Sequence, residues 1–309
     1  MNDTSISLLK QALPYLRHHR KSTMVVKLGG EIAANREALT SLAGDVSLLV
    51  HVGIRIVLVH GGGPQATEMQ KRLGLEPVMV GGRRVTDEAT LDVAKMIFAG
   101  KINTDILSAL RGQGVSAVGL SGVDGDILHA TKRPPTEVVD PATGERKVVD
   151  YGLVGDITRV DTSLVALLLE HKYVPVISSL ASHADGNVLN VNADTVASAL
   201  AKDLQASKLV ILTGVPGLLR DKNDPSSLVT RITTEEAKAA MKSGSVAGGM
   251  LPKLKALVDA VEGGVGRGHI LSGTQPGAIL LELFTSAGCG TLIAEPHDVS
   301  EVSDGAPRQ

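Results

Sequence analysis

The sequence predicts an α/β protein, an open three-layer αβα sandwich with a mainly parallel central sheet and an additional N-terminal helix. Apolar runs typical of buried strands lie near residues 24–28, 54–60, 116–120, 173–178, 207–213 and 268–271. Stretches with helical spacing alternate with them, near 36–52, 64–74, 87–111, 162–171, 193–203, 233–242, 250–262 and 276–284. Repeated strand–helix units place parallel strands in one layer and helices on both faces.

The composition fits this class. A chain of 309 residues is long enough for one large domain or two lobes with an extensive core. Apolar residues make up 43% but aromatic residues only 2%, so the core must be aliphatic. The net charge of −2 and the scarcity of aromatic rings give no reason to expect binding to nucleic acid.

Cysteine usage and hydropathy indicate a cytoplasmic protein. Cys289 is the only cysteine, so no disulfide can form within the chain and a reducing compartment is expected. No base flanks Cys289, which favours a small buried side chain over a reactive thiol. No apolar run approaches the roughly 18 residues of a membrane span, and no signal peptide is evident.

Residues 1–22 are predicted to form a separate N-terminal helix. Ile6, Leu9, Leu13 and Leu16 fall at helical spacing before a basic end. This helix either packs on its own domain or joins copies of the chain, and a third interpretation is that its basic end binds a membrane. Turn signals between short valine-rich runs predict a hairpin within 128–150, and residues 297–309 are predicted to be disordered.

Two predicted strands end in glycine-rich turns, at Lys27-Leu28-Gly29-Gly30 and at His60-Gly61-Gly62-Gly63-Pro64. The carboxyl ends of parallel strands meet at one edge of a sheet, where uncovered backbone N–H groups can bind an anion. Lys27 adds a positive charge there. Each glycine lowers the stability of a regular element by about 0.5–1 kcal/mol, so the run indicates close approach to a ligand, with a tight turn as the alternative.

Three further motifs carry candidate residues. Lys253 follows Gly248-Gly249-Met250 at the start of a predicted helix, where a cation is unfavourable unless an anion lies nearby. In Asn190-Val191-Asn192-Ala193-Asp194 the polar side chains could share one face and bind a substrate, or Asn192 or Asp194 could merely cap a helix. Arg84 could pair with a carboxylate, or be a solvated residue before a helix capped by Asp87.

Missing motifs narrow the function. The sequence has no P-loop, no dinucleotide-binding Gly-x-Gly-x-x-Gly after a strand, and no Gly-x-Ser-x-Gly, His-Glu-x-x-His or Cys-x-x-Cys. Its nine histidines are scattered, and we expect no metal site made by the protein alone. Glycine turns with lysines therefore favour phosphoryl transfer without a P-loop, over a dehydrogenase.

Together these motifs resemble the amino acid kinase family, and within it the acetylglutamate kinases. The resemblance covers about residues 24–293. In order, it rests on Lys-Leu-Gly-Gly, His-Gly-Gly-Gly-Pro, Arg-Val-Thr-Asp, Gly-Lys-Ile-Asn (100–103), Asn-Val-Asn-Ala-Asp and Gly-Gly-Met-x-Pro-Lys. It implies an amino acid kinase domain over 23–296, with an acetylglutamate-binding and dimerisation lobe (23–205) and an ATP-binding lobe (206–296).

The implied reaction transfers the γ-phosphoryl group of ATP to the side-chain carboxylate of N-acetyl-L-glutamate, in arginine biosynthesis. By the same resemblance, Lys27 and Lys253 stabilise the transferring group from either side, and Asp194 holds both lysines. Gly30 and Gly62 offer it backbone N–H groups. Mg²⁺ comes with ATP and is held mainly by phosphate oxygens.

The resemblance also implies binding residues. N-acetylglutamate is bound by Gly62, Gly63, Asn190 and Arg84, with its α-carboxylate on Arg84. The implied ATP contacts are Gly29, Thr213, Gly214, Val215, Gly217, Gly249, Met250 and Lys253. The two ends of the chain resemble the arginine-inhibited branch of the family, in which three dimers form a hexamer. Its arginine site corresponds here to Lys208, His269, Glu282 and Gly288; an acidic Glu282 suits a guanidinium.

Two departures from the family pattern leave alternatives open. Relatives usually carry Thr/Ser-Asp-Val where this chain has Thr213-Gly214-Val215, so a carboxylate near the nucleotide is lost. They often carry lysine before Asp124. A nucleotide- and arginine-binding regulator with weakened activity is therefore an alternative. So is an acetylated-aminoadipate kinase of lysine biosynthesis, since one methylene contributes only about 1–3 kcal/mol of discrimination.

Overall fold

The computed structural model describes residues 13–139, 146–285 and 288–296. The predicted N-terminal helix is therefore described only from residue 13, and residues 13–19 are helical. The predicted tail, residues 297–309, lies outside the described residues.

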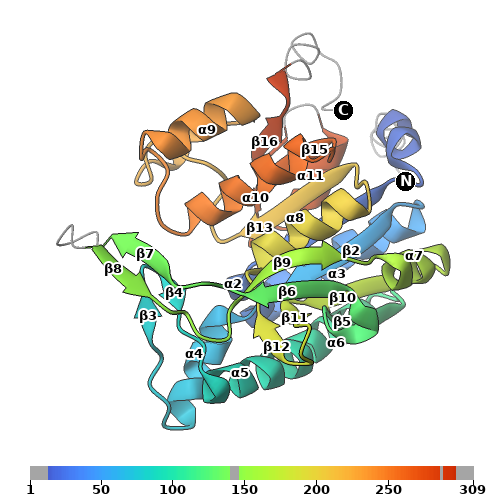
Figure 1. Ribbon diagram of the computed structural model, residues 1–309. Helices are drawn as coiled ribbons and strands as arrows, with labels where there is room; N and C mark the ends of the chain where they lie inside the picture. The colour runs from blue at the N-terminus through green and yellow to red at the C-terminus, as the bar shows by residue number, and fades with distance from the viewer. Residues whose placement is uncertain (1–12, 140–145, 286–287, 297–309) are drawn as a thin grey trace.

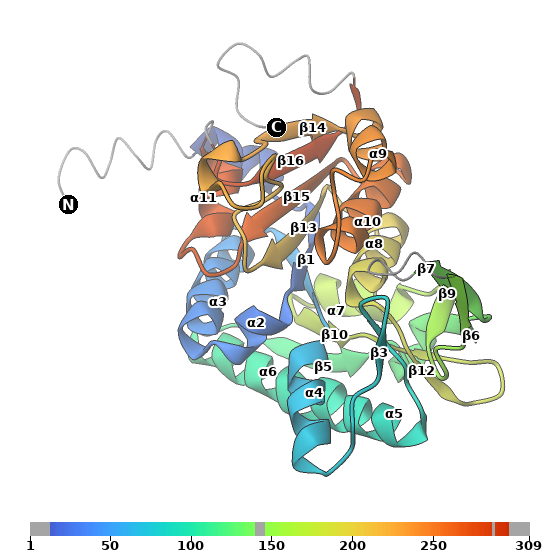
Figure 2. The same ribbon diagram turned by 90° about the vertical axis from the view of Figure 1, so that its left-hand side faces the viewer.

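An eight-stranded sheet forms the middle layer of the molecule (Figures 1 and 2). In spatial order its strands are β14 (Arg231–Thr233), β16 (Thr291–Ala294), β15 (Arg267–Ser272), β13 (Lys208–Thr213), β1 (Thr23–Leu28), β2 (Arg55–His60), β10 (Val174–Ser178) and β5 (Ala117–Ser121). Neighbouring strands are parallel except β15 and β16. The predicted mainly parallel sheet is confirmed, and the short strands β14 and β16 were not predicted.

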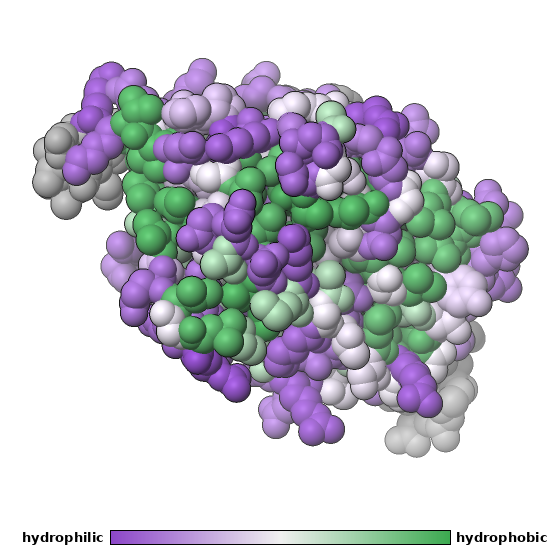
Figure 3. All heavy atoms as spheres, turned by 60° about the horizontal axis from the view of Figure 1, so that its bottom comes forward, coloured by the Kyte–Doolittle hydropathy of each residue, from purple (hydrophilic) through white to green (hydrophobic). Residues whose placement is uncertain are grey.

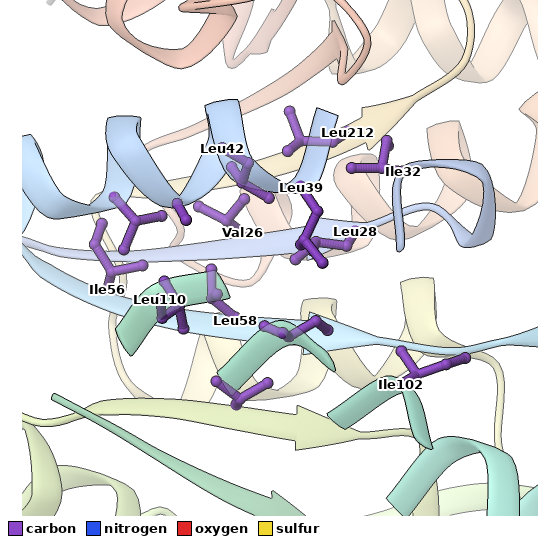
Figure 4. Packing of buried hydrophobic residues seen from close by; sticks show 14 of the residues in the cluster. Val26, Leu28, Ile32, Leu39, Leu42, Ile56, Leu58, Ile102, Leu110 and Leu212 are labelled. Carbon is purple, nitrogen blue, oxygen red and sulfur yellow. The ribbon is translucent and has the colours of Figure 1, made fainter. Parts of the chain in front are cut away.

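Alternate residues of the strands face two helical layers. Toward one side, Val26 and Leu28 of β1 and Leu58 of β2 pack under α3 (Arg36–His51) and α6 (Asn103–Gly112) (Figure 4). Toward the other, Val25, Val57 and Ile211 pack under α8 (Ala193–Asp203) and α10 (Met250–Glu262). This confirms the three-layer architecture and its aliphatic core.

The remaining helices connect these layers. They are α2 (Gly30–Ala34), α4 (Gly63–Arg72), α5 (Glu88–Lys95), α7 (Ser163–Glu170), α9 (Thr234–Lys242) and α11 (Ala278–Phe284), with short 3₁₀ turns η2 (Asp124–Asp126) and η3 (Pro225–Ser227). The predicted helix over 87–111 is divided in the structure. A π-helix, η1 (Met96–Ile102), joins α5 to α6. Asp87 caps α5, as expected.

A second, four-stranded sheet was not predicted. Its order is β12 (Val188–Asn190), β11 (Leu180–Ser182), β6 (Leu128–Lys132) and β9 (Gly155–Val160), and two hairpins pair β3 (Met79–Val80) with β4 (Arg83–Arg84) and β7 (Thr136–Val139) with β8 (Arg146–Val149). The hairpin predicted within 128–150 is β7–β8. The missed strands are short or carry many polar residues, so they lack the apolar runs of the central sheet.

The surface mixes apolar and polar side chains, as the face in Figure 3 shows. Between the end of α4 and the start of η1, the chain carries four exposed apolar side chains, those of Leu73, Val78, Met79 and Met96. Among the described helices, none has both the length and the apolar character needed to cross a bilayer.

Candidate active site

The register of three central strands brings the glycine turns together. Leu28 at the end of β1 pairs with His60 of β2 on one side and with Leu212 of β13 on the other. The segments that follow, residues 29–30, 61–63 and 214–217, therefore leave the sheet next to one another at its carboxyl edge.

A buried cluster of two lysines and one carboxylate lies at this edge. Lys27 Nζ is 2.9 Å from Asp194 Oδ1, and Lys253 Nζ is 3.9 Å from Asp194 Oδ2. The exposed fractions of the side chains are 9% for Lys27, 6% for Asp194 and 18% for Lys253. One negative charge thus holds two positive ones, and the excess positive charge favours an anion in front of the cluster.

Local structure explains why Asp194 is there. Asn192 caps α8 by accepting hydrogen bonds from the N–H groups of Asp194 (2.8 Å) and Thr195 (3.1 Å). A cap of this kind was one of the two interpretations of Asn192 from the sequence. Asp194 then falls in the first turn of α8, where a carboxylate is stabilised by the helix dipole. It is also the anion that Lys253 required in the first turns of α10.

The two glycine turns touch each other. Gly30 begins α2, and a Cβ atom there would lie 2.9 Å from Pro64 Cδ at the start of α4. Gln65 Nε2 donates to the carbonyl oxygen of Gly30 over 2.6 Å. The turn after β1 and the turn after β2 therefore form one wall of the site, with Lys27 at its base.

Arg84 contacts this wall at the turn after β2, and Asn190 is bonded to a neighbouring segment. Arg84 Nη2 donates to the carbonyl oxygen of Gly63 over 2.9 Å, and the guanidinium also contacts Thr67 Oγ1 and Gln70 Oε1. Burial lowers the pKa of Arg84 from its ordinary value. Asn190 Nδ2 donates to Thr86 Oγ1 over 3.2 Å. Arg84 is thus partly buried and bonded to α4 rather than solvated, the alternative considered from sequence.

The residues predicted to contact ATP differ in exposure. Thr213 ends β13 inside the protein, whereas Gly214 and Val215 are exposed. Gly249 is the exposed N-cap of α10 and precedes Met250. Gly217 is buried instead, because a Cβ atom there would lie 2.6 Å from Thr291 Oγ1. Packing beneath the loop therefore explains Gly217 without a nucleotide contact.

Gly214 is bonded to a carboxylate from another segment. Its backbone N–H donates to Glu31 Oε1 over 2.7 Å. Glu31 stands in the first turn of α2, and its carboxylate also lies over Gly29. A carboxylate is therefore present beside residue 214 although the chain has glycine there.

A second polar cluster is buried between the start of β13, strand β15 and helix α11. His269 Nδ1 is 2.9 Å from Glu282 Oε1, and Glu282 Oε2 accepts hydrogen bonds from the N–H groups of Cys289 (2.7 Å) and Gly290 (3.2 Å). Burial, aided by Arg267, lowers the pKa of Lys208 to about 7. Burial lowers the pKa of His269 to about 4.

The N-terminal helix meets this cluster. His19 is buried, its ring lies 6.4 Å from that of Phe284, and burial with the nearby Lys208 lowers its pKa to about 3. Gly288 N–H donates to Thr285 Oγ1 over 3.2 Å in the turn before Cys289. The structure thus brings together Lys208, His269 and Glu282, with Gly288 in the adjoining loop. Cys289 is half-buried, and its thiol donates to the carbonyl oxygen of Ala278.

Sequence reasoning missed four polar residues around this carboxyl edge of the sheet, namely Glu31, His60, Gln65 and Asn103. His60 and Asn103 lie within two of the motifs described above, and this position was the signal in the sequence that could have identified them. Glu31 and Gln65 gave no such signal, because their partners are 183 and 35 residues away in sequence.

The profile of the amino acid kinase family matches residues 22–272. The chain belongs to this family. Among curated members, the acetylglutamate kinase of Myxococcus xanthus is 48% identical, over 94% of this chain and 94% of its own. The acetylglutamate kinase of Methanothermobacter thermautotrophicus is 44% identical, over 94% of this chain and 99% of its own.

Solved structures agree with this membership. An N-acetylglutamate synthase from Neisseria gonorrhoeae, complexed with coenzyme A and N-acetyl-glutamate, superposes with a TM-score of 0.79 and 31% identity over 94% of this chain. The chain spans 63% of the length of that synthase. The carbamate kinase of Giardia has a TM-score of 0.63 at 19% identity, covers 89% of this chain and 99% of its own, and shows the shared fold.

Proposed function

We propose that this protein transfers the γ-phosphoryl group of ATP to the side-chain carboxylate of N-acetyl-L-glutamate, giving N-acetyl-L-glutamyl 5-phosphate and ADP. The observation that carries the proposal is the cluster of Lys27, Asp194 and Lys253 at the edge where the glycine turns meet. Identities of 44–48% to acetylglutamate kinases over nearly the whole chain support this acceptor.

The chemistry needs few groups. A carboxylate oxygen of the acceptor forms a bond to the γ-phosphorus while the bond to the β–γ bridging oxygen breaks and ADP leaves. The acceptor is ionised at neutral pH, so no general base is required. Catalysis then depends on positioning and on charge stabilisation. Lys27 and Lys253 supply that charge, and Asp194 keeps both ammonium groups in place.

Backbone groups and Arg84 complete the assignment. Gly30 offers its N–H to the transferring phosphoryl, Gly62 offers its N–H to the acceptor carboxylate where the two groups meet, and Gly63, Asn190 and Arg84 bind the rest of the acceptor. Arg84 already lies against the carbonyl oxygen of Gly63. Its planar guanidinium suits the α-carboxylate of N-acetylglutamate. Gly29, Thr213 to Val215, Gly249, Met250 and Lys253 face the nucleotide in this assignment.

Mg²⁺ is expected to enter with ATP. Within residues 13–139, 146–285 and 288–296, no group of three His, Cys, Asp or Glu side chains could hold a metal ion. In this proposal the ion is held mainly by phosphate oxygens, whose charge it neutralises. The residues of this chain then supply the remaining positive charge and the orientation.

Trapping the acyl phosphate tests the proposal. The purified protein is incubated with MgATP, hydroxylamine and one of three acids: N-acetyl-L-glutamate, L-glutamate or N-acetylated α-aminoadipate. We expect hydroxamate and ADP in equal amounts with N-acetyl-L-glutamate and much less with the others. Preference for the aminoadipate derivative would move the protein to lysine biosynthesis, and absence of hydroxamate with every acid would leave the nucleotide-binding regulator.

We also propose that arginine inhibits the enzyme at the buried cluster of Lys208, His269 and Glu282, beside Gly288. Its position against His19 of the N-terminal helix supports a regulatory role. So does a relative of known structure: a gonococcal N-acetylglutamate synthase complexed with coenzyme A and L-arginine is 28% identical, with a TM-score of 0.76. Calorimetric titration with arginine tests this; Glu282→Gln should abolish the heat of binding, and an unchanged titration would remove the site.

A homo-oligomer in the cytoplasm completes the proposal, as a dimer through the 23–205 lobe and as a trimer of dimers through the N-terminal helix. The exposed Leu73, Val78, Met79 and Met96 of that lobe support association. Sedimentation of the full chain should give a hexamer, and removal of residues 1–20 should leave dimers. A full-length protein that sediments as a dimer would contradict the role of the helix.

A further inference from the structure

Two residues of the sequence motifs have no role in the reaction as assigned above. His60 precedes the glycine turn, and Asn103 ends the motif Gly100-Lys101-Ile102-Asn103. Both side chains are buried, with exposed fractions of 0% and 3%. The second motif forms the end of the π-helix η1 and the start of α6. π-Helices are rare in proteins, and those that occur are often found at functional sites. This segment is therefore a candidate for a functional role.

Asn103 joins this helix to three strands of the central sheet. Its Nδ2 donates to the carbonyl oxygen of Val176 over 3.0 Å and to that of Leu120 over 3.3 Å. The same nitrogen lies 3.2 Å from His60 Nε2. Gly119 leaves the room for the amide, since a Cβ atom there would lie 2.0 Å from Asn103 Oδ1.

These contacts determine where His60 carries its proton. Carbonyl oxygens can only accept, so the amide atom that faces Val176 and Leu120 is the nitrogen. An amide nitrogen cannot accept a hydrogen bond, so His60 Nε2 carries no proton and shares a hydrogen of this NH₂ group. The proton is on Nδ1, which donates to the carbonyl oxygen of Gly61 over 2.9 Å. Burial lowers the pKa of His60 to about 4, so the ring is neutral at physiological pH.

This hydrogen bond fixes one peptide plane of the glycine turn. In a trans peptide, the carbonyl oxygen of Gly61 and the N–H of Gly62 point in opposite directions. Holding the oxygen toward the His60 ring therefore directs the N–H of Gly62 away from the ring. Without the bond, a peptide between two glycines could rotate at little cost.

The π-helix holds the other side of the turn. A Cβ atom at Gly62 would lie 2.3 Å from Ile102 Cδ1 and 2.8 Å from Phe98 Cδ1, so both side chains contact the glycine directly. The segment that carries Asn103 thus positions the histidine and also supports Gly62.

We propose that His60 and Asn103 are positioning residues, which hold the Gly61–Gly62 peptide so that the N–H of Gly62 faces the bound acceptor. The inference rests on the proposed function, because the acceptor is the carboxylic acid that function requires. Neither residue touches substrate. Both act through the backbone of the turn.

Variants of the two residues test the inference. His60→Leu and Asn103→Leu remove the hydrogen bonds, whereas His60→Asn keeps a donor near the position of Nδ1. We expect the two leucine variants to raise KM for N-acetyl-L-glutamate roughly 10-fold, the effect of one lost buried hydrogen bond, with KM for ATP changed less than about 2-fold. His60→Asn should recover most of the loss. Leu110→Ala, in the same helix α6, is the control for general destabilisation.

Nitrogen-15 spectra of the imidazole rings give a readout independent of activity. In the full-length protein we expect His60, identified by its loss in His60→Asn, to show the Nδ1–H tautomer, and Asn103→Leu to shift it toward Nε2–H. An Nε2–H tautomer in the unmodified protein would overturn the inference. Equal changes in both KM values, as expected for Leu110→Ala, would also overturn it. Absence of any turnover by the unmodified protein would instead contradict the proposed function and leave the tautomer measurable.

Discussion

The acceptor side and the nucleotide side of the proposed active site are packed differently. On the acceptor side, the turn after β2 is enclosed: Gly62 contacts Phe98 and Ile102, the Gly61 carbonyl is bonded to His60, and Gly30 meets Pro64. On the nucleotide side, Gly249 is exposed, and no atom outside its own surroundings lies within 4 Å of the place of its Cβ.

This difference indicates a division of work. The acceptor is small, and its carboxylate must lie in line with the phosphoryl group, so a wall fixed by packing places it without further ordering. ATP is larger and brings its own charges, so an open loop can close around it. The lysines come from different segments: Lys27 from the central strand and Lys253 from α10.

The largest expected effect comes from removing either lysine. Lys27→Ala and Lys253→Ala should each lower kcat by about 100- to 1000-fold, roughly 3 kcal/mol, because each removes a positioned charge from the transition state. KM for the acceptor should change only a few-fold. Steady-state kinetics with both substrates measures this, with the exposed Lys132→Ala as control. Unchanged turnover in either lysine variant would remove that residue from the mechanism.

Matched glycine substitutions test the difference in packing. Gly62→Ala should lower the free energy of unfolding by about 1–3 kcal/mol, because the new methyl group overlaps Ile102 and Phe98. Gly249→Ala should change it by less than about 0.5 kcal/mol, since its backbone is already helical and its surroundings are open. Urea denaturation measures both.

A second substitution makes this comparison more specific. Ile102→Val removes the Cδ1 atom that lies nearest to the new methyl group, so it should recover part of the stability lost in Gly62→Ala. Equal effects of the two alanine substitutions would show that the sides are packed alike.

A smaller effect on stability is expected from a contact between the two predicted lobes, residues 23–205 and 206–296. Asp45 on α3 is buried, which raises its pKa to about 6, and it accepts a hydrogen bond from the N–H of Ile279 at the start of α11. The folded state then binds more protons than the unfolded state between about pH 4 and 6. Stability from this group therefore falls as pH rises through that range and is constant above it.

Asp45→Asn should remove this dependence. The amide oxygen can still accept from Ile279, so the variant should be more stable than the original by about 1–2 kcal/mol at pH 8, with little difference at pH 4. Thermal or urea unfolding across this range measures it. A variant that is less stable at pH 8 would mean that the charged carboxylate contributes to joining the halves.

The smallest effect is expected at Glu31. Its carboxylate lies on the nucleotide loop, bonded to the N–H of Gly214, where it repels the phosphates of ATP. Glu31→Gln keeps an acceptor for Gly214 and removes the charge, so KM for ATP should fall about 2-fold, with the acceptor KM unchanged. Weaker ATP binding would show instead that the carboxylate assists the nucleotide, in place of the one missing at position 214.

The sequence allowed much of the sheet and the catalytic edge to be predicted. Lys27 and the turns after β1 and β2 were placed correctly because strand ends and glycines are local signals. The sequence predicted that an anion lies near Lys253, and the structure identifies Asp194 as such an anion. The tautomer of His60 and the bond between Glu31 and Gly214 could not be predicted, because each depends on the meeting of distant segments.

The central strand β1 also determines the distance between the two sides of the proposed active site. It is hydrogen-bonded to β2 and to β13, and the two sides of the gap follow from those strands. Their separation is therefore two inter-strand spacings, about 9.6 Å, and the halves cannot move apart without breaking the ladder. Opening and closing must come from twisting of the sheet or from the turns themselves. A slip of one residue in β1 would carry Lys27 to the opposite face of the sheet, under α3. The register of this one strand therefore determines whether the lysine reaches the reacting groups.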